Sequence, residues 1–156
     1  MTGWLRWTAP AAAIVIASPA HAVQYLSIAQ AQKLAFPSAT SFAEMQAGRA
    51  WKAQSGGQTI GLFVFDRVIG KHLYIDYSVA IGSDGHVRRV DILQYRESYG
   101  DEVKGASWLA QFVGKSSGSS LQVGSDIRNI SGATLSSHHV TEGVKRILAA
   151  YGNRAR

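Results

Sequence analysis

The stretch GLFVFDRVIGKHLYIDYSVAIGSDGHVRRVDILQY, residues 61–95, decides the fold of this chain. Residues 61–70 are rich in β-branched and aromatic side chains, which is typical of a strand. In residues 72–82, apolar side chains alternate with the others, and this alternation predicts a half-buried strand. Residues 83–85, SDG, predict a tight turn with Gly85 available for positive φ, and residues 86–95 predict the returning strand. The stretch therefore predicts a three-stranded antiparallel meander.

Helical patterns flank the meander. Residues 26–36 have apolar side chains at helical spacing after Ser27, a candidate N-cap, and the pattern ends before Pro37. Residues 38–46 are expected to add another helical turn. Residues 106–115 predict a short helix whose inward side chains are Trp108, Leu109, Phe112 and Val113.

The last helix has the clearest amphipathic pattern. Its apolar stripe consists of Val140, Val144, Ile147, Leu148 and Tyr151. Lys145 and Arg146 are expected to face away from the core, and Gly152 is a natural C-terminal stop. A twisted antiparallel sheet packed with short helices and a C-terminal amphipathic helix is an α+β domain.

Residues 1–22 have the pattern of a secretory signal peptide. Arg6 precedes a short apolar run, and Ala20-His21-Ala22 fits a small-x-small cleavage site. The run is too short to span a bilayer comfortably, and an uncleaved signal anchor is the alternative interpretation. We therefore expect residues 23–156 to form one domain in the periplasm or an equivalent extracytoplasmic space, with association to a membrane left open.

Composition excludes several classes of function. The 156 residues include no cysteine, which excludes disulfides, thiolate catalysis, iron–sulfur clusters and c-type haem attachment. The net charge is +6, and because residues 1–22 contribute only Arg6, residues 23–156 carry +5. The basic residues are scattered and form no run, so we expect no nucleic-acid partner. The excess charge suits small anionic groups or an anionic membrane surface.

The segment SGATLSS, residues 131–137, places small and hydroxyl residues directly before the last helix. The free N–H groups and the dipole at the start of a helix favour an anion, and a phosphate suits them best. A threonine hydroxyl at this place could hydrogen-bond a phosphate or be esterified by one. The alternative is that Ser136 or Ser137 merely caps the helix. Both interpretations can hold, because a cap uses only one hydroxyl.

A second candidate segment follows the meander. Glu97, Ser98, Tyr99 and Gly100 lie in a loop at the end of a predicted strand, where binding residues are frequent. Tyr99 would supply an aromatic face, and Gly100 would allow close approach of the backbone to a ligand. The alternative is an ordinary turn with solvated charges.

Other chemistries have weaker support. His138 and Glu142 could share a helix face and bind a metal, but two ligands are too few, and a solvated first turn is the favoured interpretation. A hydrolase would use Ser136 or Ser137 with a histidine, but the sequence contains no Gly-x-Ser-x-Gly motif and no carboxylate placed to orient the base. We therefore assign no catalytic residue and no metal ligand.

These segments together resemble a known family. SGATLSS resembles the Ser-Gly-Ala-Thr-x-Ser/Thr signature of FMN-binding domains. Such domains occur in the flavin-carrying subunits of sodium-translocating NADH:quinone reductase and related electron-transport complexes, and as small exported stand-alone proteins. The resemblance covers most of residues 28–150, and its other parts are AQKLAFPSA, VIGKHLYIDYSVAIGSDGHVRRVDILQYRESYGDEV and WLAQFVGK.

The resemblance implies a covalent flavoprotein. It implies that a separate flavin transferase, using FAD outside the cytoplasm, esterifies Thr134 with the phosphate of FMN. It places five residues around the phosphate and ribityl chain, namely Ser131, Gly132, Ala133, Leu135 and Ser136. It also places the loop of Glu97, Ser98, Tyr99 and Gly100, which matches the family's Glu-Thr-x-Gly loop, against the isoalloxazine ring.

The implied role is that of an electron carrier or redox subunit rather than a stand-alone enzyme. Its partner would be a membrane or periplasmic redox protein. The alternative from a different class is a non-redox exported binding module for a phosphate-bearing ligand or a protein partner.

One position departs from the family pattern. The family has an acidic residue six positions before the threonine, where this chain has Arg128. Asp126, two residues earlier, is the candidate substitute. The departure bears on recognition by the transferase rather than on the fold.

Overall fold

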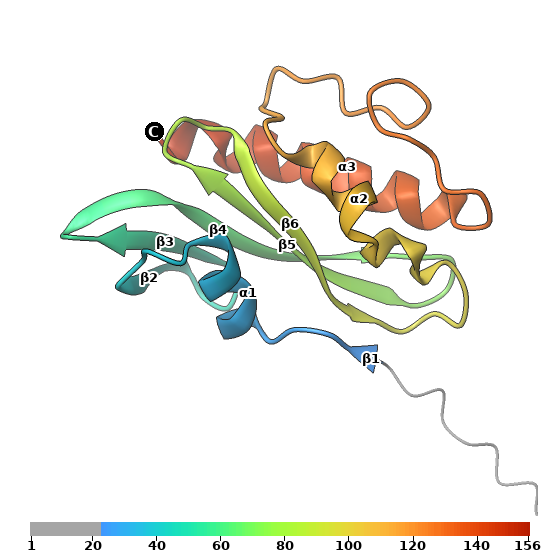
Figure 1. Ribbon diagram of the computed structural model, residues 1–156, viewed down its shortest axis with the longest axis horizontal. Coiled ribbons are helices and arrows are strands. Elements are labelled where there is room, and N and C mark those ends of the chain that lie inside the picture. Colours follow the sequence, from blue (N-terminus) through green and yellow to red (C-terminus); the bar gives the residue numbers. More distant parts are fainter. Residues whose placement is uncertain (1–22) are drawn as a thin grey trace, which may run out of the picture.

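The computed structural model describes residues 23–156, and its central element is a single antiparallel sheet (Figure 1). The predicted signal peptide at 1–22 lies outside the described residues. The sheet has six strands in the order β1-β6-β5-β4-β3-β2, and their bounds are β1 Val23–Gln24, β2 Ser41–Gln46, β3 Ala50–Ser55, β4 Gln58–Ile69, β5 Tyr74–Gly82 and β6 Val87–Tyr95. Strands β2 to β6 form one continuous meander, and β1 pairs with the far side of β6.

The predicted three-stranded meander is confirmed as β4, β5 and β6. The β5–β6 turn closes with a hydrogen bond of 2.9 Å from the N–H of Gly85 to the carbonyl of Gly82, and Gly85 has φ of +83°. β4 is longer than expected, because it begins at Gln58 and pairs with β3 as well as β5.

The prediction of a helical turn in residues 38–46 is wrong, because β2 occupies Ser41–Gln46. β2 lies at the edge of the sheet and is largely exposed, so it has no buried face to impose an alternating pattern. The half-buried assignment of residues 72–82 is also wrong. β5 is in the middle of the sheet and is buried on both faces after its first residue.

Helices cover both faces of the sheet, as Figure 1 shows. α1, Ile28–Ala35, packs on one face with Phe36, Phe63 and Ala80. Its predicted N-cap is confirmed, because Ser27 and Gln30 form a reciprocal capping box. α3, Thr134–Tyr151, packs on the other face, and its predicted apolar stripe is buried there.

The segment predicted as a helix at 106–115 is shorter than expected. It forms the short helix α2, Ala106–Leu109, and the 3₁₀ turn η2, Ala110–Phe112, and a further 3₁₀ turn, η1, Asp101–Lys104, precedes it. Trp108, Leu109 and Phe112 are buried as predicted, but Val113 is 53% exposed because the helical turns end at Phe112. A final 3₁₀ turn, η3, covers Gly152–Arg154. Within 23–156, no helix combines the length and the hydrophobicity that a membrane crossing requires.

A close backbone contact fixes how α3 lies on the sheet. Gly143 faces Tyr77 of β5, and a Cβ added there would lie 2.8 Å from Tyr77 Cζ and 3.0 Å from Val68 Cγ1. The Tyr77 hydroxyl donates to Asp66 Oδ2 at 3.1 Å, and Arg146 of α3 donates to the same oxygen at 2.8 Å. The helix is therefore held by close packing and by a shared carboxylate.

We predict that Gly143→Ala destabilises the protein by about 1–3 kcal/mol, because the added methyl group overpacks this contact. Alanine is the better helix former by about 1 kcal/mol, so a loss of stability would have to come from packing. Urea denaturation measures the free energy of unfolding. Gly118→Ala is the control, because its added Cβ would meet only Ser116 Oγ at 3.9 Å. Equal stability of the two variants would contradict the close contact.

Candidate functional site

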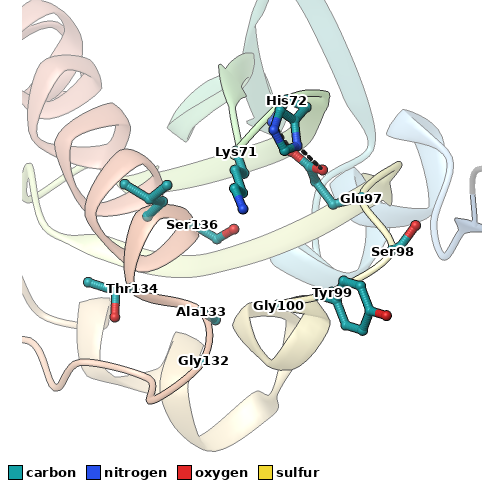
Figure 2. Close-up of a pocket in the computed structure, with 11 residues that line it drawn as sticks. Lys71, His72, Glu97, Ser98, Tyr99, Gly100, Gly132, Ala133, Thr134 and Ser136 are labelled. Carbon is teal, nitrogen blue, oxygen red and sulfur yellow. Dashed lines mark hydrogen bonds and ion pairs between the residues drawn. The ribbon is translucent and has the colours of Figure 1, made fainter.

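The two segments singled out in the sequence line one pocket of about 640 Å³ (Figure 2). It lies between the loop after β6, the start of α3 and the turn between β4 and β5. The lining residues are Lys71, His72, Glu97, Ser98, Tyr99, Gly100, Gly132, Ala133, Thr134, Leu135 and Ser136. Nine of the ten predicted site residues are in this set, and Ser131 is not.

Tyr95 joins the two segments. Its hydroxyl donates to the carbonyl of Tyr99 and lies 3.3 Å from Ser136 Oγ. Burial raises the pKa of the Tyr95 phenol above its ordinary value of 10.0, so the hydroxyl keeps its proton at neutral pH. One side chain at the end of β6 thus holds both the 97–100 loop and the first turn of α3.

Gly100 allows these segments to approach closely. Its φ is +83°, and a Cβ added there would lie 2.8 Å from the Tyr95 hydroxyl and 3.3 Å from Ala133 Cβ. A side chain at this position would therefore be strained by its backbone conformation and would push the loop away from α3.

The start of α3 has unpaired donors. The helix begins at Thr134 and has Ala133 as its N-cap, with no side-chain capping bond. In the described part of the chain, the N–H groups of Thr134, Leu135 and Ser136 have no protein acceptor. α1, by contrast, has a complete capping box.

The alternative interpretation, that Ser136 or Ser137 caps α3, is wrong, because both residues lie inside its first turn. The Ser137 hydroxyl donates back to the Ala133 carbonyl at 2.7 Å. The Thr134 side chain is exposed, and its Oγ1 accepts a hydrogen bond of 3.3 Å from Asn129 Nδ2. Thr134 thus lines the pocket beside the free N–H groups, with its hydroxyl exposed and hydrogen-bonded to Asn129.

Glu97 contacts the β4–β5 turn. Its side chain is only 9% exposed, and Oε1 accepts hydrogen bonds from the N–H groups of His72 and Leu73, the latter at 2.8 Å. Burial raises the pKa of this carboxyl, but the backbone N–H groups of the turn outweigh burial and hold the pKa below its ordinary value of 4.5. Gly70 makes room for the contact, since an added Cβ would lie 2.9 Å from Glu97 Oε1.

The sequence analysis missed Lys71 and His72 as pocket residues. The predicted meander indicates their position, because an antiparallel hairpin places its connecting turn beside the end of the next strand. Ile75 of β5 pairs with Tyr95 of β6, so the residues before β5 lie next to those after β6.

Arg128 and Asp126 are both absent from the pocket lining. Asp126 accepts hydrogen bonds from the N–H groups of Leu121 and Gln122 at 3.0 and 2.7 Å, and from Lys115 Nζ at 3.0 Å. These contacts hold the pKa of Asp126 far below its ordinary value. Its carboxylate is hydrogen-bonded within residues 115–126 and does not reach the pocket. Arg128 is exposed, and its N–H donates to Gln111 Oε1 at 2.8 Å.

The histidines at the start of α3 have different surroundings. His138 is exposed, whereas His139 Nδ1 lies 2.6 Å from the Ile69 carbonyl, so Nδ1 must carry the proton. Among residues 23–156, no three His, Cys, Asp or Glu side chains are grouped as metal ligands.

The sequence model of the FMN-binding domain family matches residues 70–149. The chain belongs to the FMN-binding domain family. The match begins in the β4–β5 turn and ends in α3, so it includes every residue that lines the pocket. A search of curated proteins found no match to the chain. Membership of the family identifies the protein as a flavin-binding one with FMN as its ligand.

The hydrogen bonds between Glu97 and the β4–β5 turn predict how the stability of this FMN-binding domain depends on pH. Because the folded pKa of Glu97 is depressed, its contribution is present above its unfolded pKa and is lost as pH falls through the folded value. We therefore expect Glu97→Gln to lower the free energy of unfolding more at about pH 7 than at about pH 3. Urea denaturation at both pH values measures this difference, with Glu102→Gln as the control. A destabilisation that is the same at both pH values would contradict it.

Proposed function

We propose that this protein is an exported flavoprotein that carries FMN on Thr134 through a phosphoester and relays electrons. The single observation that supports the attachment most strongly is the position of the Thr134 hydroxyl. It is exposed, it belongs to a residue that lines the pocket within the family match, and it adjoins a helix start whose N–H groups lack protein acceptors.

The residues present fit FMN. Three N–H groups at the head of an 18-residue helix favour a phosphate, and Gly132 and Ala133 leave room beside them. The pocket of about 640 Å³ is within the range of about 300–1,000 Å³ that small-molecule and cofactor sites occupy. Tyr99, 86% exposed at the rim, offers an aromatic face to a planar ring.

The attachment requires a transferase as a partner and FAD as the donor. The Thr134 hydroxyl loses its proton, and its oxygen forms a bond to the phosphorus of the FMN half of FAD. The bond from that phosphorus to the oxygen bridging to the AMP half breaks, so AMP leaves and nothing is oxidised or reduced. A covalent tether suits an extracytoplasmic protein, because dissociated FMN would be lost by dilution.

Bound FMN supplies reversible electron exchange, and the chain supplies binding, orientation and local charge. The exposed side chains at the rim, Tyr99 and Leu135, leave the pocket accessible to a docking protein. This accessibility supports electron relay to a membrane or periplasmic redox partner. The alternative is a non-redox module that binds a phosphate-bearing ligand or a protein, and such a module would be colourless after denaturation.

We predict that protein exported together with a flavin transferase gains the mass of one FMN less one water. The flavin should remain with the chain in denaturant, because a phosphoester does not depend on the fold. Thr134→Ala should abolish the added mass, and Thr134→Ser should retain part of it, because a hydroxyl remains at the same place. Intact-protein mass spectrometry in denaturant is the measurement.

Ser136→Ala is the matched control, because it removes a neighbouring hydroxyl of the same pocket and leaves Thr134 in place. Loss of the added mass in Ser136→Ala but not in Thr134→Ala would contradict the assignment. An unmodified wild-type chain beside an active transferase would also contradict it.

We propose that export proceeds by cleavage after Ala22. Val23, the first residue after the proposed cleavage site, pairs with Tyr95 of β6 and is therefore part of the sheet. N-terminal sequencing of the exported protein should therefore begin at Val23. An intact Met1 on a membrane-bound form would establish the signal-anchor alternative instead.

A further inference from the structure

The β4–β5 turn brings a lysine to the flavin pocket. Among the described residues that line the pocket, Lys71 alone is a lysine or arginine. Figure 2 shows its side chain extending from the turn toward the space between α3 and the 97–100 loop. In the described part of the chain, its ammonium group has no hydrogen-bond acceptor and no ion-pair partner. An unpaired cation at the wall of a ligand pocket is available to the ligand.

The backbone that carries Lys71 is held from two sides. Within the turn, the N–H of Gly70 donates to the Leu73 carbonyl at 2.7 Å. From the end of β6, the Glu97 carboxylate accepts the N–H groups of His72 and Leu73. From α3, His139 Nδ1 donates to the carbonyls of Ile69 and Gly70 at 2.6 and 3.1 Å. The Lys71 backbone is therefore fixed by contacts on both of its flanks.

The phosphate end of the pocket has its own donors, at the start of α3. Lys71 belongs to the opposite wall, beside the 97–100 loop, which would border the remainder of a bound FMN. Among the described residues, the other titratable side chains on that wall are His72, Glu97 and Tyr99. Glu97 is turned to the backbone of the β4–β5 turn, and its Oε2 lies 3.9 Å from His72 Nδ1.

We propose that Lys71 is the cation that raises the redox potential of the bound flavin, and that Glu97 is the positioning residue that holds the Lys71 turn at the pocket. This inference rests on the proposed function. Reduction adds electron density to the flavin ring, and a nearby positive charge favours the more electron-rich form. Glu97 therefore acts on the flavin through Lys71 rather than as a ring contact.

The test is a redox titration of the flavinylated protein with dithionite, followed by visible absorbance. We expect Lys71→Gln to weaken the preference for reduced over oxidised flavin about tenfold, which lowers a two-electron potential by about 30 mV. Lys71→Arg retains the charge and should keep the wild-type potential. Lys52→Gln, which removes one exposed positive charge from β3 far from the pocket lining, is the matched control and should also be unchanged. An unchanged potential in Lys71→Gln would overturn the proposal. This holds also if the yield of flavinylation falls, because Lys71 would then interact with the phosphate rather than tune the ring.

The role of Glu97 is tested by a double-mutant cycle. If Glu97 positions Lys71, Lys71→Gln should shift the potential much less in a Glu97→Ala background than in the wild type. Glu97→Ala alone should lower the potential, whereas loss of a negative charge acting directly on the ring would raise it. A full Lys71 effect in the Glu97→Ala background would overturn the positioning role.

Failure of this inference can be told apart from failure of the proposed function. Mass spectrometry reports first whether Thr134 carries FMN. If it does not, the covalent proposal fails, and the Lys71 assignment is tested with free FMN in its oxidised and dithionite-reduced forms. Lys71→Gln should then weaken binding of reduced FMN about tenfold more than binding of oxidised FMN. This ratio of affinities corresponds to the tenfold change in the preference for reduced flavin, because binding and reduction form one thermodynamic cycle. Equal losses for both forms would overturn it.

Discussion

The Tyr95 hydroxyl connects the sheet to the 97–100 loop and to the start of α3, which form two walls of the candidate pocket. It donates to the Tyr99 carbonyl and contacts Ser136 Oγ, so the last residue of β6 fixes a loop and the start of a helix that is 41 positions away in sequence. The pocket has this form because Gly100 has no Cβ, which would lie 2.8 Å from the Tyr95 hydroxyl and 3.3 Å from Ala133 Cβ. Shape at this place depends on one buried phenol and one residue without a side chain.

The position of α3 on the sheet makes that contact possible. Gly143 lies against Tyr77, and Arg146 shares the carboxylate of Asp66 with the Tyr77 hydroxyl. Arg49 of the β2–β3 turn pairs with the other oxygen of Asp66 at 3.1 Å. These contacts in the middle of the helix set its axial position, and its first turn consequently reaches the loop after β6. Core packing therefore places the N–H groups on which phosphate binding would depend.

The sequence predicted the parts of the fold that have strong periodic patterns. β4 is rich in β-branched and aromatic residues, β5 alternates in sequence and is followed by a tight turn, α3 buries a regular apolar stripe, and Ser27 and Gln30 form a local capping motif. All of these were predictable from neighbours in sequence. β2 was not, because an exposed edge strand carries no alternation. The burial of both faces of β5 was not predictable either, because α1 covers a face whose own residues do not indicate a partner. Capping by Ser136 or Ser137, the alternative interpretation of SGATLSS, does not hold, because the helix begins at Thr134.

The segments of the candidate site were predictable, but their contacts were not. SGATLSS and the 97–100 loop both line the pocket, whereas Glu97 faces the backbone of the β4–β5 turn through long-range hydrogen bonds that no local pattern encodes. Lys71 enters the site for the same reason, since only the strand register brings its turn beside Glu97.

Peptide mapping of the exported, flavinylated protein tests the central claim most directly. Trypsin cleaves after Arg128 and Lys145, so Thr134 lies in the peptide spanning residues 129–145, which also contains the hydroxyls of Ser131, Ser136, Ser137 and Thr141. Fragmentation of this peptide separates these positions. We predict one FMN phosphate on Thr134. Flavin on another hydroxyl of the peptide, flavin on a different peptide, or flavin released from the chain on denaturation would contradict it.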